Sequence, residues 1–183
     1  LFFLFLFSLC RNPALAEEKT VFLTGSCGFI GSNFLVYMYQ NYPTYNFIVL
    51  DALTYAGSLE NIPIEIQESD RFEFFHDSVV NFPLVSELMS RSDYVVHFAA
   101  ETHVTRSIAD DYVFFETDVL GTRALLAALV KNRHLVERFI HISTSEVYGT
   151  SKTDLMDETH LLNPRSPYAA AKAAADRLVY AYN

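Results

Sequence analysis

The segment Thr24-Gly25-Ser26-Cys27-Gly28-Phe29-Ile30-Gly31 decides the fold of this 183-residue chain. It joins a short apolar run, residues 20–23, to an apolar stretch over residues 32–40 that is long enough for a buried helix. Glycines at this spacing let the backbone turn sharply and bring a pyrophosphate to the N-terminus of the following helix. The order of strand, turn and helix therefore predicts a dinucleotide-binding fold. The residues of this turn expected at the cofactor are Gly25, Gly28, Phe29, Ile30 and Gly31.

Asp51 ends the next apolar run, residues 47–50, and follows Gly31 by 20 residues. At that distance an acidic side chain commonly accepts hydrogen bonds from the ribose hydroxyls of the adenosine. A carboxylate would repel a 2′-phosphate, so the spacing favours NAD over NADP. The glycines alone could form an ordinary tight turn, and it is their combination with Asp51 that indicates dinucleotide binding.

Further apolar runs predict three more strands, over residues 72–75, 94–99 and 138–143. The near-continuous apolar run from 94 to 99 is typical of a strand covered on both faces, as in parallel sheets. Helices are expected over residues 112–131 and from about 168 to 182. We therefore predict an α/β fold, a doubly wound parallel sheet of the Rossmann type, over residues 18–183.

Tyr168 and Lys172 lie one helical turn apart in an alanine-rich segment. A lysine ammonium, together with a positive nicotinamide, favours a phenolate and would lower the pKa of the tyrosine from about 10 toward neutrality. Tyr168 could then take the proton of a substrate hydroxyl. The same spacing also occurs in ordinary exposed helical pairs, and the dinucleotide context favours the catalytic interpretation.

Thr144, Ser145 and Glu146 follow the predicted strand 138–143, at the edge of the sheet where α/β proteins bind ligands. Thr144 is expected to hydrogen-bond the same substrate oxygen as Tyr168, or alternatively to cap a local turn. Once a sugar carbon becomes a ketone, the proton on the next carbon is acidic, and Glu146 could remove it. Ser145 is a weak proton donor or a relay through water. With Tyr168 and Lys172, these three residues form the predicted catalytic set.

The composition excludes several classes of function. Thirteen basic and 22 acidic residues give a formal charge of −9, which argues against a nucleic-acid or anionic-membrane surface. Cys10 and Cys27 provide neither a disulfide framework nor metal-ligand spacing, and they favour a reducing, cytoplasmic location. His97, Glu101 and His103 match no metal motif, so we expect no metal and interpret His97 as a core residue. Four phenylalanines are also expected in the core: Phe74, Phe75, Phe114 and Phe115.

Residues 1–17 form a separate apolar extension. Leu1 to Leu9 is almost wholly apolar, and Ala14-Leu15-Ala16 resembles a signal-peptidase site. No basic region precedes the apolar run, and nine residues are too few to span a bilayer as a helix. These features favour a mis-set start or a fragment boundary over an export signal, and we expect no integral membrane span.

Five phrases in a fixed order carry a family resemblance. They are Thr24 to Gly31, Leu50-Asp51-Ala52-Leu53-Thr54-Tyr55-Ala56-Gly57, His97-Phe98-Ala99-Ala100-Glu101-Thr102-His103, Ser143 to Gly149, and Asn163-Pro164-Arg165-Ser166-Pro167-Tyr168. The chain thereby resembles the extended short-chain dehydrogenase/reductase superfamily and its NAD-dependent epimerase/dehydratase family, most closely the dTDP-glucose 4,6-dehydratases. The resemblance implies a homodimer that holds NAD tightly and converts a nucleotide-sugar to its 4-keto-6-deoxy product, with the cofactor reduced and reoxidised in one turnover.

The resemblance also implies further site residues, and it implies that the family's fold is longer than this chain. It implies cofactor contacts from Asp77, Ser78, Ala99 and Ala100, and from Tyr168 and Lys172 as well. The implied substrate contacts are Glu101, Thr102, His103 and Thr144. The family continues beyond the tyrosine-lysine helix with more of the sheet and a smaller substrate domain, so we expect the chain to be a fragment.

Five residues at four places depart from the family pattern. Ser145 stands where an aspartate acid is usual, Asp118 where an asparagine is usual, Thr105 where an aspartate is usual, and Asp77-Ser78 where the family has Gly-Asp. A Thr-Ser-Glu triplet is similar to GDP-mannose dehydratases, some UDP-N-acetylhexosamine dehydratases and UDP-glucuronate decarboxylases. The alternatives to a dTDP-glucose 4,6-dehydratase are therefore a UDP-sugar 4,6-dehydratase, a 4-epimerase or decarboxylase, or a degenerate NAD-binding module without activity.

Overall fold

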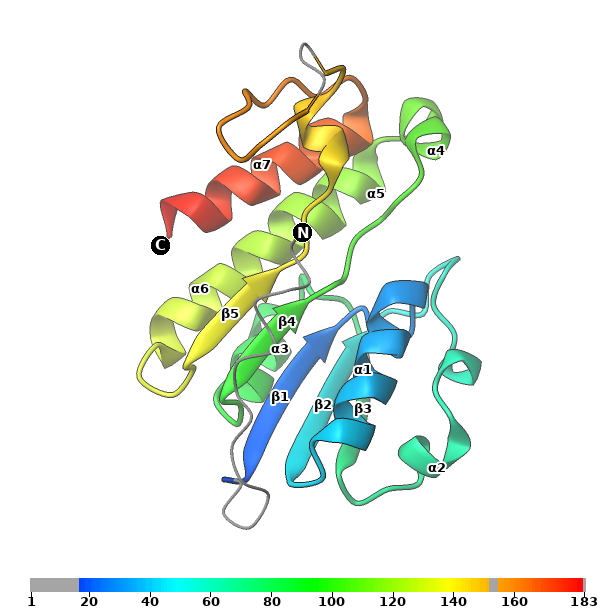
Figure 1. Cartoon of the computed structure of the whole chain (residues 1–183), viewed down its shortest axis with the longest axis vertical. Helices are drawn as coiled ribbons and strands as arrows, with labels where there is room; N and C mark the ends of the chain where they lie inside the picture. Colours follow the sequence, from blue (N-terminus) through cyan, green and yellow to red (C-terminus); the bar gives the residue numbers. More distant parts are fainter. Residues whose placement is uncertain (1–16, 152–154, 183) are drawn as a thin grey trace.

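The computed structural model of the protein describes residues 17–151 and 155–182. Its centre is a five-stranded sheet in the order β3-β2-β1-β4-β5, and all four pairings are parallel (Figure 1). The strands are β1 (Lys19–Thr24), β2 (Tyr45–Asp51), β3 (Phe72–His76), β4 (Tyr94–His97) and β5 (Arg138–His141). The predicted doubly wound parallel sheet is confirmed. The apolar run from Leu1 to Leu9 and the Ala14-Leu15-Ala16 sequence lie outside the described residues.

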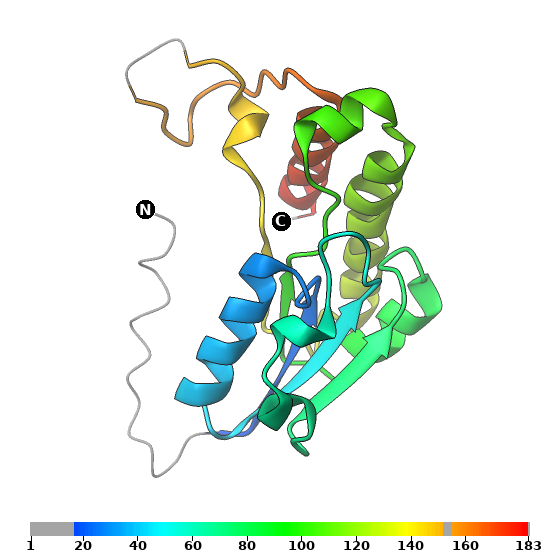
Figure 2. The ribbon, with the colours of Figure 1, turned by 90° about the vertical axis from the view of Figure 1, so that its right-hand side faces the viewer.

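Helices cover both faces of the sheet, as Figure 2 shows. One face packs against α1 (Phe29–Asn41), the short turn η3 (Leu59–Asn61) and α2 (Ile64–Gln67), and the other packs against α3 (Phe82–Met89) and α6 (Thr122–Asn132). Successive strand residues point to opposite faces, so Val21 and Leu23 join the first cluster and Phe22 the second. Because both faces of the sheet are covered, the central strands are almost continuously apolar and do not alternate apolar with polar residues.

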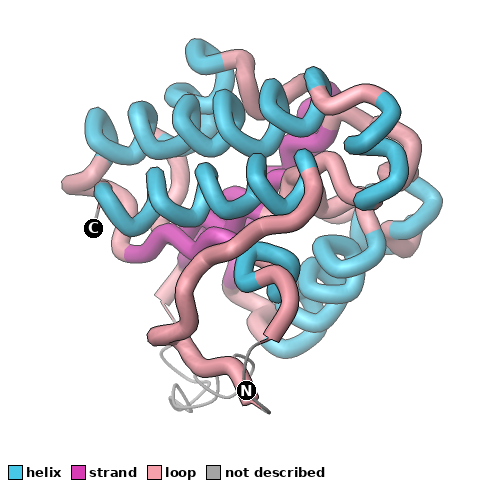
Figure 3. Tube along the Cα trace, turned by 90° about the horizontal axis from the view of Figure 1, so that it is seen from above, coloured by secondary structure: helices cyan, strands magenta, loops and turns pink. Residues whose placement is uncertain are grey.

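A helical layer lies beyond the carboxyl ends of the strands. It consists of α4 (Val104–Ala109), α5 (Tyr112–Phe114), the π-helical segment η4 (Phe115–Gly121), η5 (Ser145–Tyr148) and α7 (Pro167–Ala181). Helix α7 runs alongside α6 and packs on η4 (Figures 1 and 3). A π-helical turn is rare and often marks a functional site. Here it contributes Thr117 to the lining of a cleft and places buried Asp118 near Lys172 of α7.

Several sequence predictions need correction. Strand β4 ends at His97 and β5 at His141, because the residues that follow leave the sheet to line a cleft. The helix predicted over 112–131 is divided into α5, η4 and α6, and α2, α3 and α4 were not predicted. Phe114 is buried, but Phe115 is 39% exposed, since neighbouring helical residues cannot face the same core. Phe74 and Phe75 are only partly buried because β3 is an edge strand.

The prediction that His97 is a satisfied core residue is confirmed. Its ring is buried, with Nδ1 2.7 Å from Thr24 Oγ1 and Nε2 3.0 Å from Thr122 Oγ1. Burial lowers the pKa of His97 well below its usual value, so the ring is neutral. Within residues 17–151 and 155–182, none of the helices combines the length and apolar character needed to cross a bilayer.

Candidate active site

The glycine turn has the shape that its sequence predicts. Gly25 has a φ of +73°, and a Cβ there would lie 2.4 Å from the backbone nitrogen of Ala99. A Cβ on Gly31 would lie 2.6 Å from the carbonyl oxygen of Gly25. Gly28 is the N-cap of α1 and provides no side-chain hydrogen bond to the first turn of that helix. The backbone N–H groups at the start of α1 therefore remain open to an anion.

Asp51 lies at the carboxyl end of β2, where it braces the same turn. The residue is 8% exposed, and its carboxylate accepts hydrogen bonds from the backbone N–H groups of Cys27 at 2.8 Å and Leu53 at 2.9 Å. Burial, with the nearby charge of Asp51, raises the pKa of the Cys27 thiol to about 12. Cys27 is thus a packing residue without thiolate reactivity.

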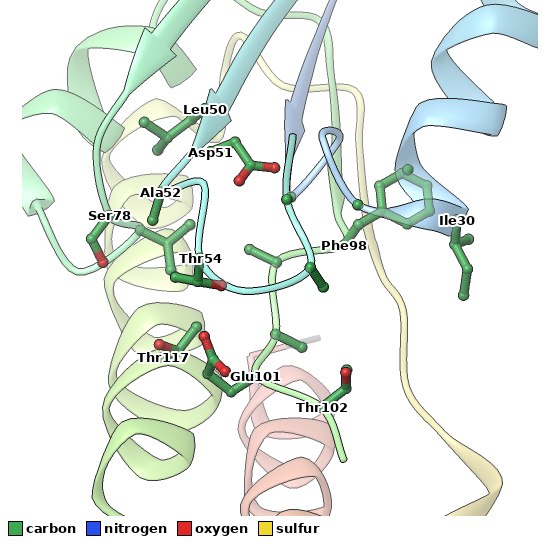
Figure 4. A pocket seen from close by; sticks show the side chains of 18 of the residues that line it. Ile30, Leu50, Asp51, Ala52, Thr54, Ser78, Phe98, Glu101, Thr102 and Thr117 are labelled. Atoms are coloured by element: carbon green, nitrogen blue, oxygen red, sulfur yellow. The ribbon is translucent and has the colours of Figure 1, made fainter. Parts of the chain in front are cut away.

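A cleft of about 300 Å³ opens along the carboxyl edge of β2, β1 and β4. Its walls contain all the residues of the turn, the sheet edge and the β4 loop that the sequence assigned to the cofactor, as well as Glu101 and Thr102 (Figure 4). Those predicted lining residues are Gly25, Gly28, Phe29, Ile30, Gly31, Asp51, Asp77, Ser78, Ala99 and Ala100. The predicted cofactor wall is therefore assembled as one surface, while His103 and the catalytic set lie outside this lining.

Asp77 and Ser78 line the cleft after β3, and the side chain of Asp77 is bonded within its own loop. The carboxylate of Asp77 accepts hydrogen bonds from the N–H of Ser78 at 2.6 Å and from Asn81 Nδ2 at 2.7 Å. This arrangement leaves the Ser78 side chain at the cleft surface, as Figure 4 shows. The departure from a Gly-Asp pair is thus compatible with an open cleft.

Thr144, Glu146 and Tyr168 lie together beyond the end of β5. Thr144 caps η5, and its Oγ1 accepts a hydrogen bond from the N–H of Glu146 at 3.3 Å. It also interacts with the phenol of Tyr168 at the start of α7. The local cap is therefore present and the same side chain contacts the phenol, while the hydrogen bond from Thr144 to a substrate oxygen stays a prediction. Ser145 and Glu146 are exposed.

In the protein without cofactor, the surroundings of Tyr168 shift its pKa in the direction opposite to that predicted for the protein with NAD. Burial raises the pKa of its phenol above 10, the contact with Thr144 lowers it, and the negative charges of Asp118 and Glu146 raise it further. The predicted shift toward neutrality includes the charge of a bound nicotinamide, so it stays a prediction for the protein with its cofactor. A positive group beside the phenol would be needed to reverse the shift, and nicotinamide has that charge.

Lys172 is almost fully buried one turn further along α7. Its Nζ donates a hydrogen bond to the carbonyl oxygen of Ile142, at 2.8 Å, and Ile142 lines the cleft. Burial lowers the pKa of the ammonium, whereas the carboxylates of Asp118 and Asp176 raise it. Lys172 thus connects α7 to the lining of the cleft through the backbone that follows β5.

Asp118 and Glu101 have buried carboxylates, and the charges of Glu101 and Lys172 both act on that of Asp118. Asp118 Oδ1 accepts the N–H of Glu101 at 2.8 Å, while Asp118 Oδ2 and Glu101 Oε2 have no hydrogen-bond partner. Burial raises the pKa of Asp118 to about 7, and Lys172 opposes that shift. Glu101 Oε2 still forms a 3.6 Å ion pair with Arg106 Nη1. Each of these buried oxygens therefore lacks the hydrogen bond that a buried acceptor usually has, and Arg106 offsets only the charge of Glu101.

The residues present fit a dinucleotide. The uncapped start of α1 suits a pyrophosphate, the glycines leave no room for side chains beneath it, and Asp51 lines the cleft at the end of β2, where ribose hydroxyls would bind. Within the described part of the chain, no three His, Cys, Asp or Glu residues are grouped as a metal site would require.

Sequence reasoning missed some residues of the site. Thr117, on η4, lines the cleft, and Tyr55 joins the cleft edge to Thr102. Arg106 packs its guanidinium 3.8 Å from the centre of the Tyr55 ring. Tyr55 belongs to one of the phrases that carry the family resemblance, but its partners are distant in sequence and no spacing rule identifies them.

Comparison with known proteins assigns the family. A sequence profile described as GDP-mannose 4,6 dehydratase matches residues 22–183. The chain belongs to this family. The predicted membership of the NAD-dependent epimerase/dehydratase group is thereby confirmed, and so is the similarity to dTDP-glucose 4,6-dehydratases. The enzyme of that name from Streptomyces antibioticus is 43% identical over 166 residues, which cover 88% of this chain and 48% of the relative.

Solved structures agree with the sequence comparison. A double mutant of the dTDP-glucose 4,6-dehydratase DesIV from Streptomyces venezuelae, with NAD and DAU bound, superposes with a TM-score of 0.83 at 41% identity, covering 88% of this chain and 51% of that one. The UDP-Glc/GlcNAc 4-epimerase from Campylobacter jejuni gives 0.80 at 27% identity, covering 90% and 49%. The chain therefore spans about half the length of the relatives it matches.

Proposed function

We propose that the protein is an NAD-dependent nucleotide-sugar 4,6-dehydratase, a lyase that converts dTDP-glucose to dTDP-4-keto-6-deoxyglucose. The observation that carries the proposal is the grouping of Thr144, Glu146 and Tyr168 at the end of β5, beside a cleft formed by the glycine turn and Asp51. Oxidation of an alcohol needs Thr144 and Tyr168. Glu146 adds a base that simple oxidation does not require.

The cofactor in this proposal is NAD. When bound, it would accept a hydride from the sugar C4 and return one to C6, so the overall reaction has no net redox change. The start of α1 would hold the pyrophosphate and Asp51 the adenosine ribose. Bound NAD in solved relatives such as DesIV supports this assignment.

The residues of the chain would move protons in two stages. Tyr168 Oη takes the proton of the C4 hydroxyl while Thr144 Oγ1 orients the same oxygen. Glu146 then removes the proton from C5, which the new C4 ketone has made acidic, and the C6 hydroxyl leaves as water with a proton supplied by Ser145 or a water molecule. When a hydride is added at C6, C5 regains a proton from Glu146, which can exchange with solvent. Glu101, Thr102 and His103 would contact the sugar. The family resemblance supports these roles and the predicted homodimer. The composition supports the predicted cytoplasmic location.

The experiment that tests the proposal is Glu146→Gln in the whole protein as encoded. Proton abstraction at C5 needs the carboxylate, so the variant should oxidise C4 but stall before water is lost, with turnover reduced by about 10²–10⁴-fold. Mass spectrometry of the bound nucleotide-sugar should find the 4-keto sugar with its C6 hydroxyl intact. Solvent deuterium should no longer enter C5.

The control is Glu158→Gln, an exposed glutamate in the same connection between β5 and α7 that belongs to no part of the proposed mechanism. Its turnover should match that of the unmodified protein. Normal turnover by Glu146→Gln, or a 4-epimer product that retains its C6 hydroxyl, would contradict the dehydratase and favour an epimerase. The absence of any nucleotide-sugar chemistry would favour a binding module.

A further inference from the structure

Two loops approach each other above the glycine turn. The first follows β2 and places Thr54, Ala56 and Gly57 in the cleft lining, while the second follows β4 and places Glu101 and Thr102 in the opposite wall. Because β1 lies between β2 and β4 in a parallel sheet, the glycine turn at the end of β1 lies between these loops. A bond between the two loops therefore joins segments that lie on either side of that turn.

Tyr55 makes such a bond. Its Oη lies 2.7 Å from Thr102 Oγ1 and 3.1 Å from the carbonyl oxygen of Thr102. The phenol can donate to the carbonyl while the threonine hydroxyl donates to the phenol, which gives a reciprocal pair. Arg106 stacks on the Tyr55 ring and forms an ion pair with buried Glu101, so the contact is also joined to the inner wall of the cleft.

Backbone conformation marks the same two loops. Among the described residues, Leu53 (φ +50°) and His103 (φ +93°) are the non-glycine residues with a left-handed φ. Leu53 precedes Tyr55 by two positions, and His103 directly follows Thr102. Such conformations are costly and persist where surrounding contacts impose them, commonly at ligand clamps. The first loop is also tied to the turn itself, since the N–H of Ser58 donates to the carbonyl oxygen of Cys27 at 3.0 Å.

We propose that Tyr55 is a latch that retains the dinucleotide: its bond to Thr102 closes the mouth of the cleft, and its opening limits the release of the cofactor. This inference rests on the proposed function, in which the cleft holds NAD. An enzyme that returns its hydride to the same sugar has no need to exchange the cofactor between turnovers. A closing contact is therefore compatible with catalysis, whereas it would slow an enzyme that releases reduced cofactor at every cycle.

The test measures the release rate of the dinucleotide. NADH is bound to the whole protein, an excess of NAD is added, and the loss of NADH fluorescence is followed in stopped flow. Tyr55→Phe keeps the ring under Arg106 and removes only the hydroxyl, so the release rate should rise about three- to tenfold, the range for one exposed hydrogen bond. Thr102→Val removes the partner hydroxyl from the opposite loop and should give a similar rise. The double variant should show less than the product of the two effects.

The matched control is Tyr37→Phe, an exposed tyrosine on α1 outside the cleft lining, which should leave the release rate unchanged. Hydrogen exchange of the free protein provides a readout independent of the cofactor. Loss of the latch should accelerate exchange in residues 52–58 and 98–106 together, without a change in the melting temperature.

The outcomes separate this inference from the proposed function. Faster release with coupled exchange supports the latch. Tight NADH binding with an unchanged release rate in both Tyr55→Phe and Thr102→Val overturns the latch and leaves the cofactor site intact. Failure of the unmodified protein to bind NADH or NAD overturns the proposed function, and the retention role with it.

Discussion

Different interactions hold the two halves of the candidate site: backbone hydrogen bonds in one and buried ionisable groups in the other. The glycine turn and Asp51 form a region in which backbone groups satisfy one another, and Asp51 accepts two of those N–H groups. The region around Tyr168 and Lys172 instead places ionisable groups in a buried setting, where Asp118 and Glu101 each leave one oxygen without a hydrogen bond. The first region is rigid because of its geometry. The second depends on charge, and a ligand or a proton can change it.

This contrast predicts how each region fails. Substitutions of Gly25 and Gly31 should change stability by steric overlap at any pH, because the atoms that a new Cβ would meet belong to the backbone and do not titrate. Substitutions among the buried carboxylates should change stability by amounts that depend on pH.

Gly25→Ala should destabilise the protein by about 3–5 kcal/mol, because a left-handed φ and a backbone overlap add their costs. The new Cβ would lie 2.4 Å from the backbone nitrogen of Ala99, an atom that cannot move without displacing the loop after β4. Urea unfolding measures the change in the free energy of unfolding. Gly28→Ala is the matched control, because its Cβ would meet nothing closer than 3.4 Å and should cost less than about 1 kcal/mol. Equal losses in the two variants would contradict the steric account.

Asp118→Asn should stabilise the protein near pH 8 by about 2 kcal/mol. The folded-state pKa of Asp118 is raised to about 7, so its stabilising contribution is present below about pH 4 and is lost as the pH rises to about 7. The full shift corresponds to roughly 4 kcal/mol, an upper limit because asparagine also loses the attraction of Lys172. The gain should vanish near pH 4, where the aspartate is protonated.

The measurement for Asp118→Asn is the melting temperature of both proteins between about pH 4 and pH 8. Burial lowers the pKa of His97 and lowers that of His141 to about 4, so these histidines act in the opposite sense and reduce stability as the pH falls below about 6.5. The variant should therefore lose more stability on acidification than the unmodified protein. Exposed Asp111→Asn is the control, and a gain that does not depend on pH would contradict the assignment.

The same division separates what the sequence predicted from what it did not. The glycine turn, Asp51 and the parallel sheet follow from short spacings and apolar runs, since local sterics determine them. The raised pKa of Tyr168 and the pairing of Tyr55 with Thr102 arise from contacts across long stretches of chain, which no local pattern encodes. The prediction that Phe115 is a core residue was wrong for a related reason, because the apolar character of a helix does not fix which side of it is buried.

The smallest effect concerns the choice of cofactor, and it tests whether the rigid region also carries a charge-based function. If Asp51 accepts the adenosine ribose hydroxyls, its carboxylate should repel the 2′-phosphate of NADP, and the dissociation constant for NADP should exceed that for NAD. Asp51→Asn retains an oxygen that can accept one of the two backbone N–H groups but removes the charge, so the ratio of the two dissociation constants should fall about tenfold, as measured by titration calorimetry. Asp77→Asn is the matched control, because Asp77 also lines the cleft but already bonds Ser78 and Asn81. An equal fall in both variants would mean that the overall negative charge of the cleft discriminates between the cofactors. A fall confined to Asp51→Asn would show that one residue serves both regions of the comparison, as a brace for the turn and as a charged selector.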